Sequence, residues 1–267
     1  MKTNKLFFAC ASVVVLMLPA SAQKSTPSVE LERLTWPEIR HAIQDEGKTT
    51  VLLYSGGTEQ RGPQGVTAKH TLAAQYVGRR IAEKLGDALL APVLPYSVDR
   101  ADSKLPGTIG LSGSAYATVI EELAEQLIAN GFKNVVLLSD NGGGQRELES
   151  VALKLDAKWA PQGVRVVHAP DVYRKAGTDA NAWLKESNLP PGNHAGIKDT
   201  SELLFLGEGN VRKELLPTAI TDENRTNGIS GDARKSTPEI GKHILDLKVE
   251  VGVAQIRQLL SAKPASQ

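Results

Sequence analysis

Apolar runs that end in glycine-rich polar turns limit the fold of this chain more than any other feature. "TTVLLYS" at 49–55 leads into "GGTEQRG", and "KNVVLLS" at 133–139 leads into "DNGGG". Runs that are apolar or β-branched at nearly every position are typical of strands buried on both faces of a sheet. Segments with helical spacing lie between these runs. The alternation predicts βαβ units, and therefore a single α/β domain with a mostly parallel sheet between layers of helices.

Helix ends and further strands are also marked in the sequence. Thr35 and Pro37 are suited to start a helix that Gly47 ends, and Ser112 or Ser114 to cap one that Gly131 ends. "TSELLFLG" is compatible with either a helix or a strand. The remaining expected elements are strands in "ALLAPVLPYS" and "GVRVVHAP" and helices over 67–85, 145–158 and 237–261.

The N-terminus has the pattern of a targeting segment. Lys2 and Lys5 precede an apolar run of 13 residues, 6–18, which is too short to span a bilayer comfortably. Ala20-Ser21-Ala22 has the small-residue spacing of a signal-peptidase site. The sequence therefore predicts export, to the periplasm or the medium, after cleavage near Ala22. The expected organisation is a signal peptide at 1–22, a flexible lead at 23–30, the α/β domain at 31–262 and a tail at 263–267.

Composition excludes several kinds of protein. With 41% hydrophobic and 23% charged residues, the chain is typical of a globular protein. Aromatic residues make up only 4% and the formal charge is +1, so a nucleic-acid partner is not indicated. Cleavage after Ala22 removes Cys10, the only cysteine. The mature protein therefore has no disulfide, no thiolate nucleophile and no cysteine-ligated zinc. It is also not expected to stay inserted in a membrane.

Polar side chains that are able to act in catalysis or binding follow the expected strands. In open α/β sheets, functional groups collect where the carboxyl ends of strands meet the loops. The residues that this rule selects are Glu59 and Arg61 after the first strand, Asp99 and Asp102 after the second, Asp140 and Asn141 after the third, and His194 and Asp199 in the loop at 192–202.

Common catalytic and nucleotide-binding motifs are absent from the sequence. The chain has no G-x-G-x-x-G, no phosphate-binding loop, no G-x-S-x-G and no H-E-x-x-H. The residues alone therefore support a small-molecule hydrolase or a small-molecule binding protein. Three interpretations of Arg61 remain open: a salt-bridged turn, an anion site, and a metal site that has lost a ligand.

Six segments, in order, resemble the creatininase (creatinine amidohydrolase) family. "GGTEQRGPQGVTAKHT" resembles the family's S-T-E-Q-H-G-P-H-L-P-L-G-T-D-T, and "VLPYSVDRADSKLPGTIGLS" resembles P-Y-G-x-S-x-x-H-x-x-F-P-G-T-I-S-L. "HAGIKDTS" resembles H-A-G-E-x-E-T-S. The other three are "LTWPEI", "GFKNVVLLSDNGGG" and "NGISGDARKSTPEIGKHIL". The resemblance implies a three-layer α/β/α sandwich, assembly as a homohexamer, and hydrolysis of a cyclic or linear amide at a centre with one or two metal ions.

The same alignment shows substitutions at most of the family's ligand positions. Glu59 and His194 are kept. The family's histidine falls on Arg61, its bridging aspartate on His70, and the histidine of N-G-H on Asn141. Because arginine carries only donors and stays charged, Arg61 cannot ligate a cation. The resemblance therefore implies at most one divalent metal (zinc, manganese or iron), or none.

Two hypotheses follow for the function of the protein, and in both of them it binds a small molecule. The first is an exported amidohydrolase with a rebuilt centre, and the second is an inactive family member that binds an anion or an amide. The residues expected to act are Glu59, His194 and Asp199 in catalysis, Arg61, Asn141 and Asp102 in substrate binding, and Glu59, His70 and Asp140 (with Asn141 or Asp199 as alternatives) at the metal.

Overall fold

Four parallel strands form the central sheet of the protein, in the order β2-β1-β3-β4. The computed structural model describes residues 28–262 apart from 103, 191, 193 and 219–225, so the predicted signal peptide, most of the predicted lead and the predicted tail lie outside it. The pairings of β1 with β2, β1 with β3 and β3 with β4 are all parallel, which confirms the predicted sheet. The strands are β1 (Thr50–Ser55), β2 (Ala88–Leu90), β3 (Asn134–Ser139) and β4 (Arg165–His168).

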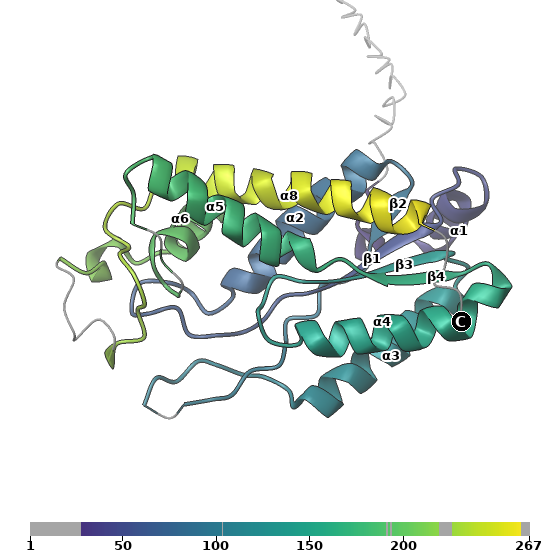
Figure 1. Ribbon diagram of the computed structural model, residues 1–267, viewed down its shortest axis with the longest axis horizontal. Helices are drawn as coiled ribbons and strands as arrows, with labels where there is room; N and C mark the ends of the chain where they lie inside the picture. Colours follow the sequence, from purple (N-terminus) through teal and green to yellow (C-terminus); the bar gives the residue numbers. More distant parts are fainter. Residues whose placement is uncertain (1–27, 103, 191, 193, 219–225, 263–267) are drawn as a thin grey trace, which may run out of the picture.

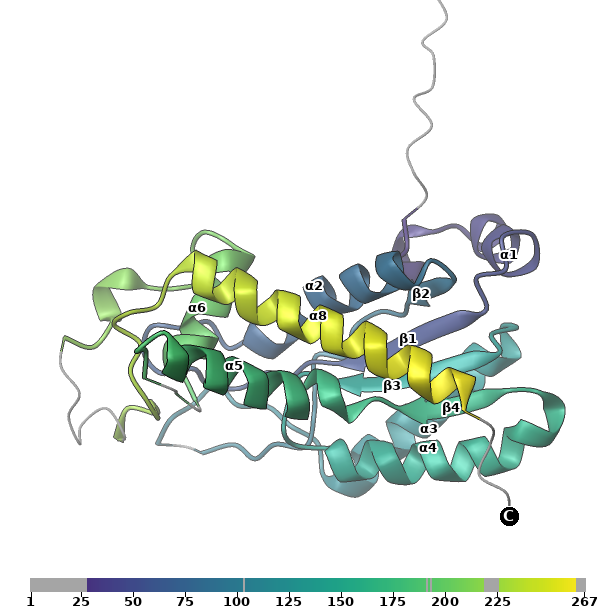
Figure 2. The ribbon, with the colours of Figure 1, turned by 45° about the horizontal axis from the view of Figure 1, so that its top comes forward.

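Helices cover both faces of this sheet, so the predicted three-layer α/β/α sandwich is confirmed (Figures 1 and 2). Alternate strand residues point to opposite layers. Leu53 and Leu137 pack with α3 and α4, whereas Leu52 and Leu138 pack with α2 and α8. The helices are α1 (Trp36–Gln44), α2 (Lys69–Leu85), α3 (Gly113–Ala129), α4 (Gln145–Trp159), α5 (Arg174–Glu186), α6 (Ile197–Leu206) and α8 (Pro238–Ser261).

Most helices begin where the sequence predicts. Ser112 caps α3 by accepting from the amide of Ala115, and Thr237 caps α8 by accepting from the amide of Ile240. "TSELLFLG" is part of helix α6. Single 3₁₀ turns occur at η1 (Leu31–Arg33), η2 (Ala160–Gln162), η3 (Pro170–Val172) and η4 (Lys213–Leu215). Within the described part of the chain, no helix combines the length and apolarity needed to cross a bilayer.

Helix α5 was not predicted from the sequence. Its buried stripe consists of Ala176, Ala180 and Leu184, which recur every four residues as a helix requires. Two of the three are alanines, so the buried stripe differs little in hydrophobicity from the rest of the helix. The omission matters because α5 packs against α8 and provides one wall of the pocket described below.

The strand order places a crevice beside β1. The chain passes from β1 to β2 on one side, and β3 pairs with β1 on the other, so the loops that leave β1 and β3 diverge. The amide of Asp140 donates to the carbonyl of Ser55 at 3.0 Å, which keeps the two strand ends adjacent. The segments that carry Glu59 and Asp140 therefore begin side by side.

Stability is expected to fall at mildly acidic pH because His168 is buried at the end of β4. Its Nε2 lies 3.1 Å from Oε1 of Gln145, and burial, followed by the charge of Arg174, lowers the pKa of His168 to about 4. Between this value and the ordinary pKa of about 6.5, the unfolded chain binds more protons than the folded chain. His168 should therefore contribute a decrease of about 3 kcal/mol to the free energy of unfolding as the pH falls from 7 to 4.

Urea denaturation at a series of pH values measures this loss. His168→Gln should flatten the pH dependence between pH 7 and pH 4. Equal slopes for wild type and His168→Gln would show that His168 does not cause the acid sensitivity.

Candidate active site

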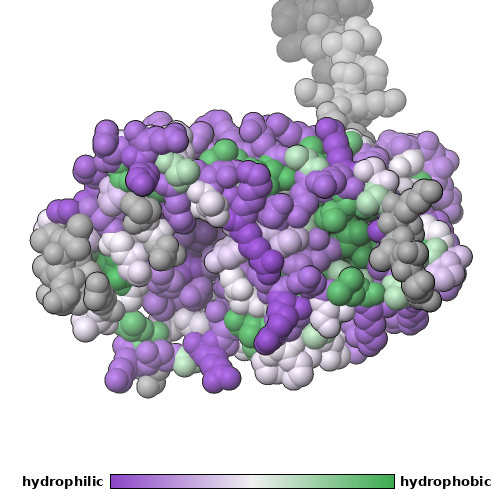
Figure 3. Space-filling model, viewed as in Figure 1, coloured by the Kyte–Doolittle hydropathy of each residue, from purple (hydrophilic) through white to green (hydrophobic). Residues whose placement is uncertain are grey.

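A pocket of about 370 Å³ lies at the carboxyl ends of β1 and β3, between the strand-end loops and helices α5, α6 and α8. Hydrophilic side chains cover most of the face shown in Figure 3, which is hollowed beside α5 and α6. Seven of the predicted site residues line the pocket: Glu59, Arg61, His70, Asp140, Asn141, His194 and Asp199. The fold therefore brings together groups that are up to 140 residues apart in the sequence.

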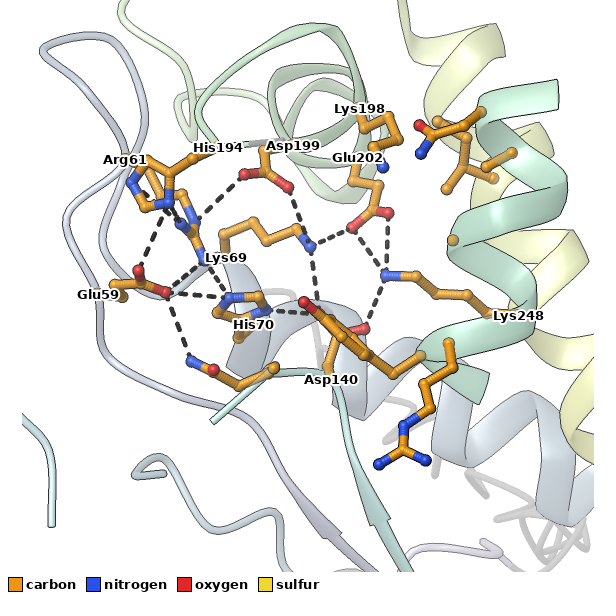
Figure 4. A pocket seen from close by; sticks show the side chains of 18 of the residues that line it. Glu59, Arg61, Lys69, His70, Asp140, His194, Lys198, Asp199, Glu202 and Lys248 are labelled. Atoms are coloured by element: carbon orange, nitrogen blue, oxygen red, sulfur yellow. Dashed lines mark hydrogen bonds and ion pairs between the residues drawn. The ribbon is translucent and has the colours of Figure 1, made fainter. Parts of the chain in front are cut away.

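Arg61 lies at the centre of these side chains. It is only 3% exposed, and its Nη2 donates to Oε2 of Glu59 at 2.7 Å. Its Nη1 lies 2.5 Å from Nδ1 of His194, and Nη2 also contacts Nε2 of His70 (Figure 4). Nε of Arg61 lies 3.6 Å from Oδ2 of Asp199. One guanidinium thus contacts a carboxylate and two imidazoles at the same time.

The two histidines each have further polar neighbours. Nδ1 of His70 lies 2.8 Å from Oδ2 of Asp140, which can only accept, and Nε2 of His70 lies 3.2 Å from Oε2 of Glu59. Nε2 of His194 lies 2.9 Å from Nε2 of Gln60, an amide nitrogen that can only donate. Burial, followed by the charge of Arg61, lowers the pKa of His194, which favours the neutral ring.

Two buried lysines extend the set of charges behind Arg61. Lys69 lies within 3.3 Å of carboxylate oxygens of Asp140, Asp199 and Glu202. Lys248 reaches Asp140 at 2.7 Å and Glu202 at 2.9 Å. We call these ion-paired residues the buried charge network: the cations Arg61, Lys69 and Lys248, the carboxylates Glu59, Asp140, Asp199 and Glu202, and His70.

The network keeps its carboxylates ionised. Burial alone would raise the pKa of Glu59, but hydrogen bonding to His70 and the charge of Arg61 outweigh it and lower the pKa to about 2. Lys248, Lys69 and His70 likewise hold the pKa of Asp140 well below its usual range, and Lys69 and Arg61 do the same for Asp199. Glu59, Asp140 and Asp199 are therefore ionised at neutral pH.

Local backbone structure positions the groups around Arg61. Gly57 follows β1, and a Cβ atom there would lie 2.9 Å from Nδ2 of Asn141 and 3.6 Å from the side chain of His70. A larger residue would therefore displace the side chain of Asn141, whereas the approach to His70 is an ordinary van der Waals contact. Asp199 is in the first turn of α6, where its Oδ2 accepts from the amide of Ala195 at 2.9 Å.

Asp102 is the one predicted site residue that the structure does not place at the pocket. It is exposed, and its Oδ1 accepts from the amide of Lys104 at 2.9 Å, which closes a local turn. Asp99 is the aspartate of this loop that reaches the site, since its Oδ2 lies 2.8 Å from Nδ2 of Asn141. Burial, followed by the charge of Glu59, raises the pKa of Asp99 to about 6.

Sequence reasoning missed Lys69, Glu202 and Lys248 as site residues. For Lys248 a signal was available, because it falls on the buried stripe of α8 between Ile244, Leu245 and Val249. A lysine at that spacing needs a buried counter-charge. For Lys69 and Glu202, no pattern in the sequence separates them from solvent-exposed charges.

Comparison with known proteins identifies the class. The family model described as creatininase, creatinine amidohydrolase, matches residues 32–256. The chain therefore belongs to the creatininase family, whose members are hydrolases of amide C–N bonds. A search of curated proteins by the same chain finds no match.

Solved structures with the same fold include several creatininases. A creatinine amidohydrolase (creatininase) is 21% identical, covers 89% of this chain and 100% of its own, and has a TM-score of 0.70. A mutant creatininase of the Zn-Zn type is 22% identical over the same shares, also with a TM-score of 0.70. A putative creatinine amidohydrolase from Bacteroides fragilis is 15% identical, covers 82% and 92%, and has a TM-score of 0.64. At these identities the likeness shows the fold.

The residues of this chain do not fit the metal that such relatives hold. Glu59, His70 and His194 do converge, but on the guanidinium of Arg61, which occupies the position between them and carries a fixed positive charge. Asp140, the third predicted ligand, is already paired with Lys69 and Lys248. Among the described residues, no group of three or more His, Cys, Asp or Glu side chains is arranged to hold a metal ion.

Proposed function

We propose that this protein hydrolyses an amide C–N bond of a small polar molecule in the pocket around Arg61, at a centre that does not require a divalent metal. One observation carries the proposal: the guanidinium of Arg61 contacts Glu59, His70 and His194 together, and so supplies positive charge among the side chains that line the pocket. Membership of a family of amidohydrolases supports the reaction type.

Glu59 is the proposed base. Its Oε2 is engaged by Arg61 and His70, whereas Oε1 has only His194 nearby, at 3.5 Å, among the described residues. The side chain is 21% exposed, so a water molecule can reach it. In the proposed reaction, Oε1 accepts a proton from the water as the water oxygen attacks the carbonyl carbon. Glu59 then delivers that proton to the leaving nitrogen, so that it ends the reaction ionised again.

His194 is the proposed donor to the carbonyl oxygen. A neutral imidazole with its proton on Nε2 can stabilise a developing oxyanion by donating a hydrogen bond. In the free protein, Nε2 of Gln60, an amide nitrogen that can only donate, lies 2.9 Å from Nε2 of His194. In the proposed reaction, the substrate carbonyl displaces Gln60, and Nε2 of His194 then carries the proton that it donates.

Removal of the base tests this function most directly. Glu59→Gln keeps an oxygen that can accept from Arg61 but cannot take a proton from water, so the turnover number should drop by a factor of about 10²–10⁴. Amine release from creatinine and from a panel of cyclic and linear amides measures the rate. Wild-type activity should also survive dialysis against a chelator, since the proposed centre contains no metal ion.

Two results would reject parts of the proposal. Equal turnover by wild type and Glu59→Gln would remove Glu59 as the base, and activity that is lost with the chelator and restored by zinc or manganese would remove the metal-independent centre. Binding of amides without any turnover would instead favour the second hypothesis, an inactive family member. Arg61, Lys69 and Lys248 are each already paired with a carboxylate of the protein, and this observation supports the alternative.

A further inference from the structure

The pocket has two walls of different chemical character. The wall formed by the strand-end loops and α8 carries the buried charge network, in which every cation already has a carboxylate within 4 Å. The opposite wall, formed by α5 and the start of α6, carries polar side chains that have no such partners. The first wall is therefore occupied by its own contacts, and the second is free to recognise a ligand.

Lys198 is the most informative residue of this second wall. It lines the pocket from the first turn of α6, half-buried, and Figure 4 shows its ammonium group beside Glu202 with no dashed line reaching it. Within the described residues, the ammonium of Lys198 has neither a hydrogen bond nor an ion pair within 4 Å, although the charges of Asp199 and Glu202 act on it from farther away. The nearby charges of Asp199 and Glu202 are taken up by Lys69, Arg61 and Lys248. A half-buried ammonium without a counter-ion gains most from an anion that arrives in the pocket.

Two side chains of α5 face the same space. Asn181 lines the pocket, and in the described part of the chain its buried Oδ1 has no hydrogen-bond partner, so Oδ1 can accept from an N–H of a ligand while Nδ2 donates to an anion. Arg174 also lines the pocket, is exposed, and has no side-chain hydrogen bond or ion pair to another described residue. A carboxamide and a guanidinium thus accompany the ammonium of Lys198 on one side of the cavity.

We infer that the substrate carries a carboxylate in addition to its amide, and that Lys198 binds this carboxylate with help from Asn181 and Arg174. The pocket is lined by five cationic side chains and four carboxylates, so an added anion brings the two signs into balance. One ammonium and one carboxamide N–H match the two oxygens of a carboxylate. The inference rests on the proposed function for the presence of the amide, but not for the presence of the anion.

Binding of a matched pair of probes separates the two ideas. N-acetylglycine and N-acetylglycinamide share an amide and differ in one carboxylate, and their affinities are measured by calorimetry on the full mature chain. The wild type should bind N-acetylglycine at least about tenfold more tightly. Lys198→Met should abolish this preference and leave the affinity for N-acetylglycinamide unchanged. Lys185→Met, an exposed lysine of α5 outside the pocket, should retain the preference.

Three outcomes would overturn the inference: equal affinity of the wild type for the two probes, no binding of N-acetylglycine, or a preference that persists in Lys198→Met. Asn181→Ser provides a second variant if circular dichroism shows that Lys198→Met is unfolded, and it should reduce the preference in the same direction. Because binding is measured without turnover, a protein that prefers the carboxylate but hydrolyses nothing would retain this inference and reject the proposed function.

Discussion

Lys248→Met is expected to destabilise the protein by about 3–5 kcal/mol, as removal of one partner from a buried ion pair does elsewhere. Lys248 is 6% exposed, and its ammonium lies 2.7 Å from Oδ1 of Asp140 and 2.9 Å from Oε1 of Glu202. Methionine fills a similar volume but leaves both carboxylates short of a cation. Among the described residues, Lys69 then remains as their only shared partner. Urea denaturation at pH 7 measures the change in the free energy of unfolding.

Two further variants separate charge from packing. Lys248→Met combined with Glu202→Gln removes one charge of each sign, and should recover part of the loss in a double-mutant cycle. Lys242 lies six residues earlier on α8 and pairs with Asp246, and the two side chains are 58% and 41% exposed. Lys242→Met should therefore have little effect. If Lys242→Met cost as much as Lys248→Met, the buried charge network would not be the source of the stability.

Replacement of Arg61 by histidine, together with His70→Asp and Asn141→His, is expected to convert the pocket into a divalent-metal site. The triple variant restores three residues of the family pattern and removes the guanidinium that lies between Glu59, His70 and His194. Zinc or manganese should then remain bound in stoichiometric amount after gel filtration. At a metal concentration of 100 times the dissociation constant, the folded state should gain about 2.7 kcal/mol, measured as a higher unfolding temperature.

Asn141→His alone is the matched control for this experiment. It adds an imidazole to the site but retains Arg61, whose charge repels a cation, so its metal content should stay at the wild-type level. If the triple variant bound no more metal than this single variant, Arg61 would not be the group that prevents metal binding in the pocket. The outcome is independent of turnover, since it depends only on which cation the donors around Arg61 can hold.

Much of the framework was accessible from sequence because it depends on local patterns. The apolar runs at 49–55 and 133–139 predicted β1 and β3, and their glycine-rich turns predicted where Glu59 and Asp140 lie. The alignment of motifs predicted that Arg61 stands at a ligand position. Asp102 was chosen over Asp99 in the same loop, because a motif gives an order of residues and not the direction in which a turn points each side chain.

The sequence by itself determined the layered α/β architecture, the site of the strand-end crevice and the presence of an arginine that cannot bind a metal. These follow from apolar periodicity, from turn chemistry and from the fixed charge of a guanidinium. Only the tertiary structure decided which charges meet. Lys69, Glu202 and Lys248 come from three different helices, α2, α6 and α8, and each helix fixes only the face on which its own residue lies. Their pairing depends on how those faces pack around Asp140, which local sequence does not encode.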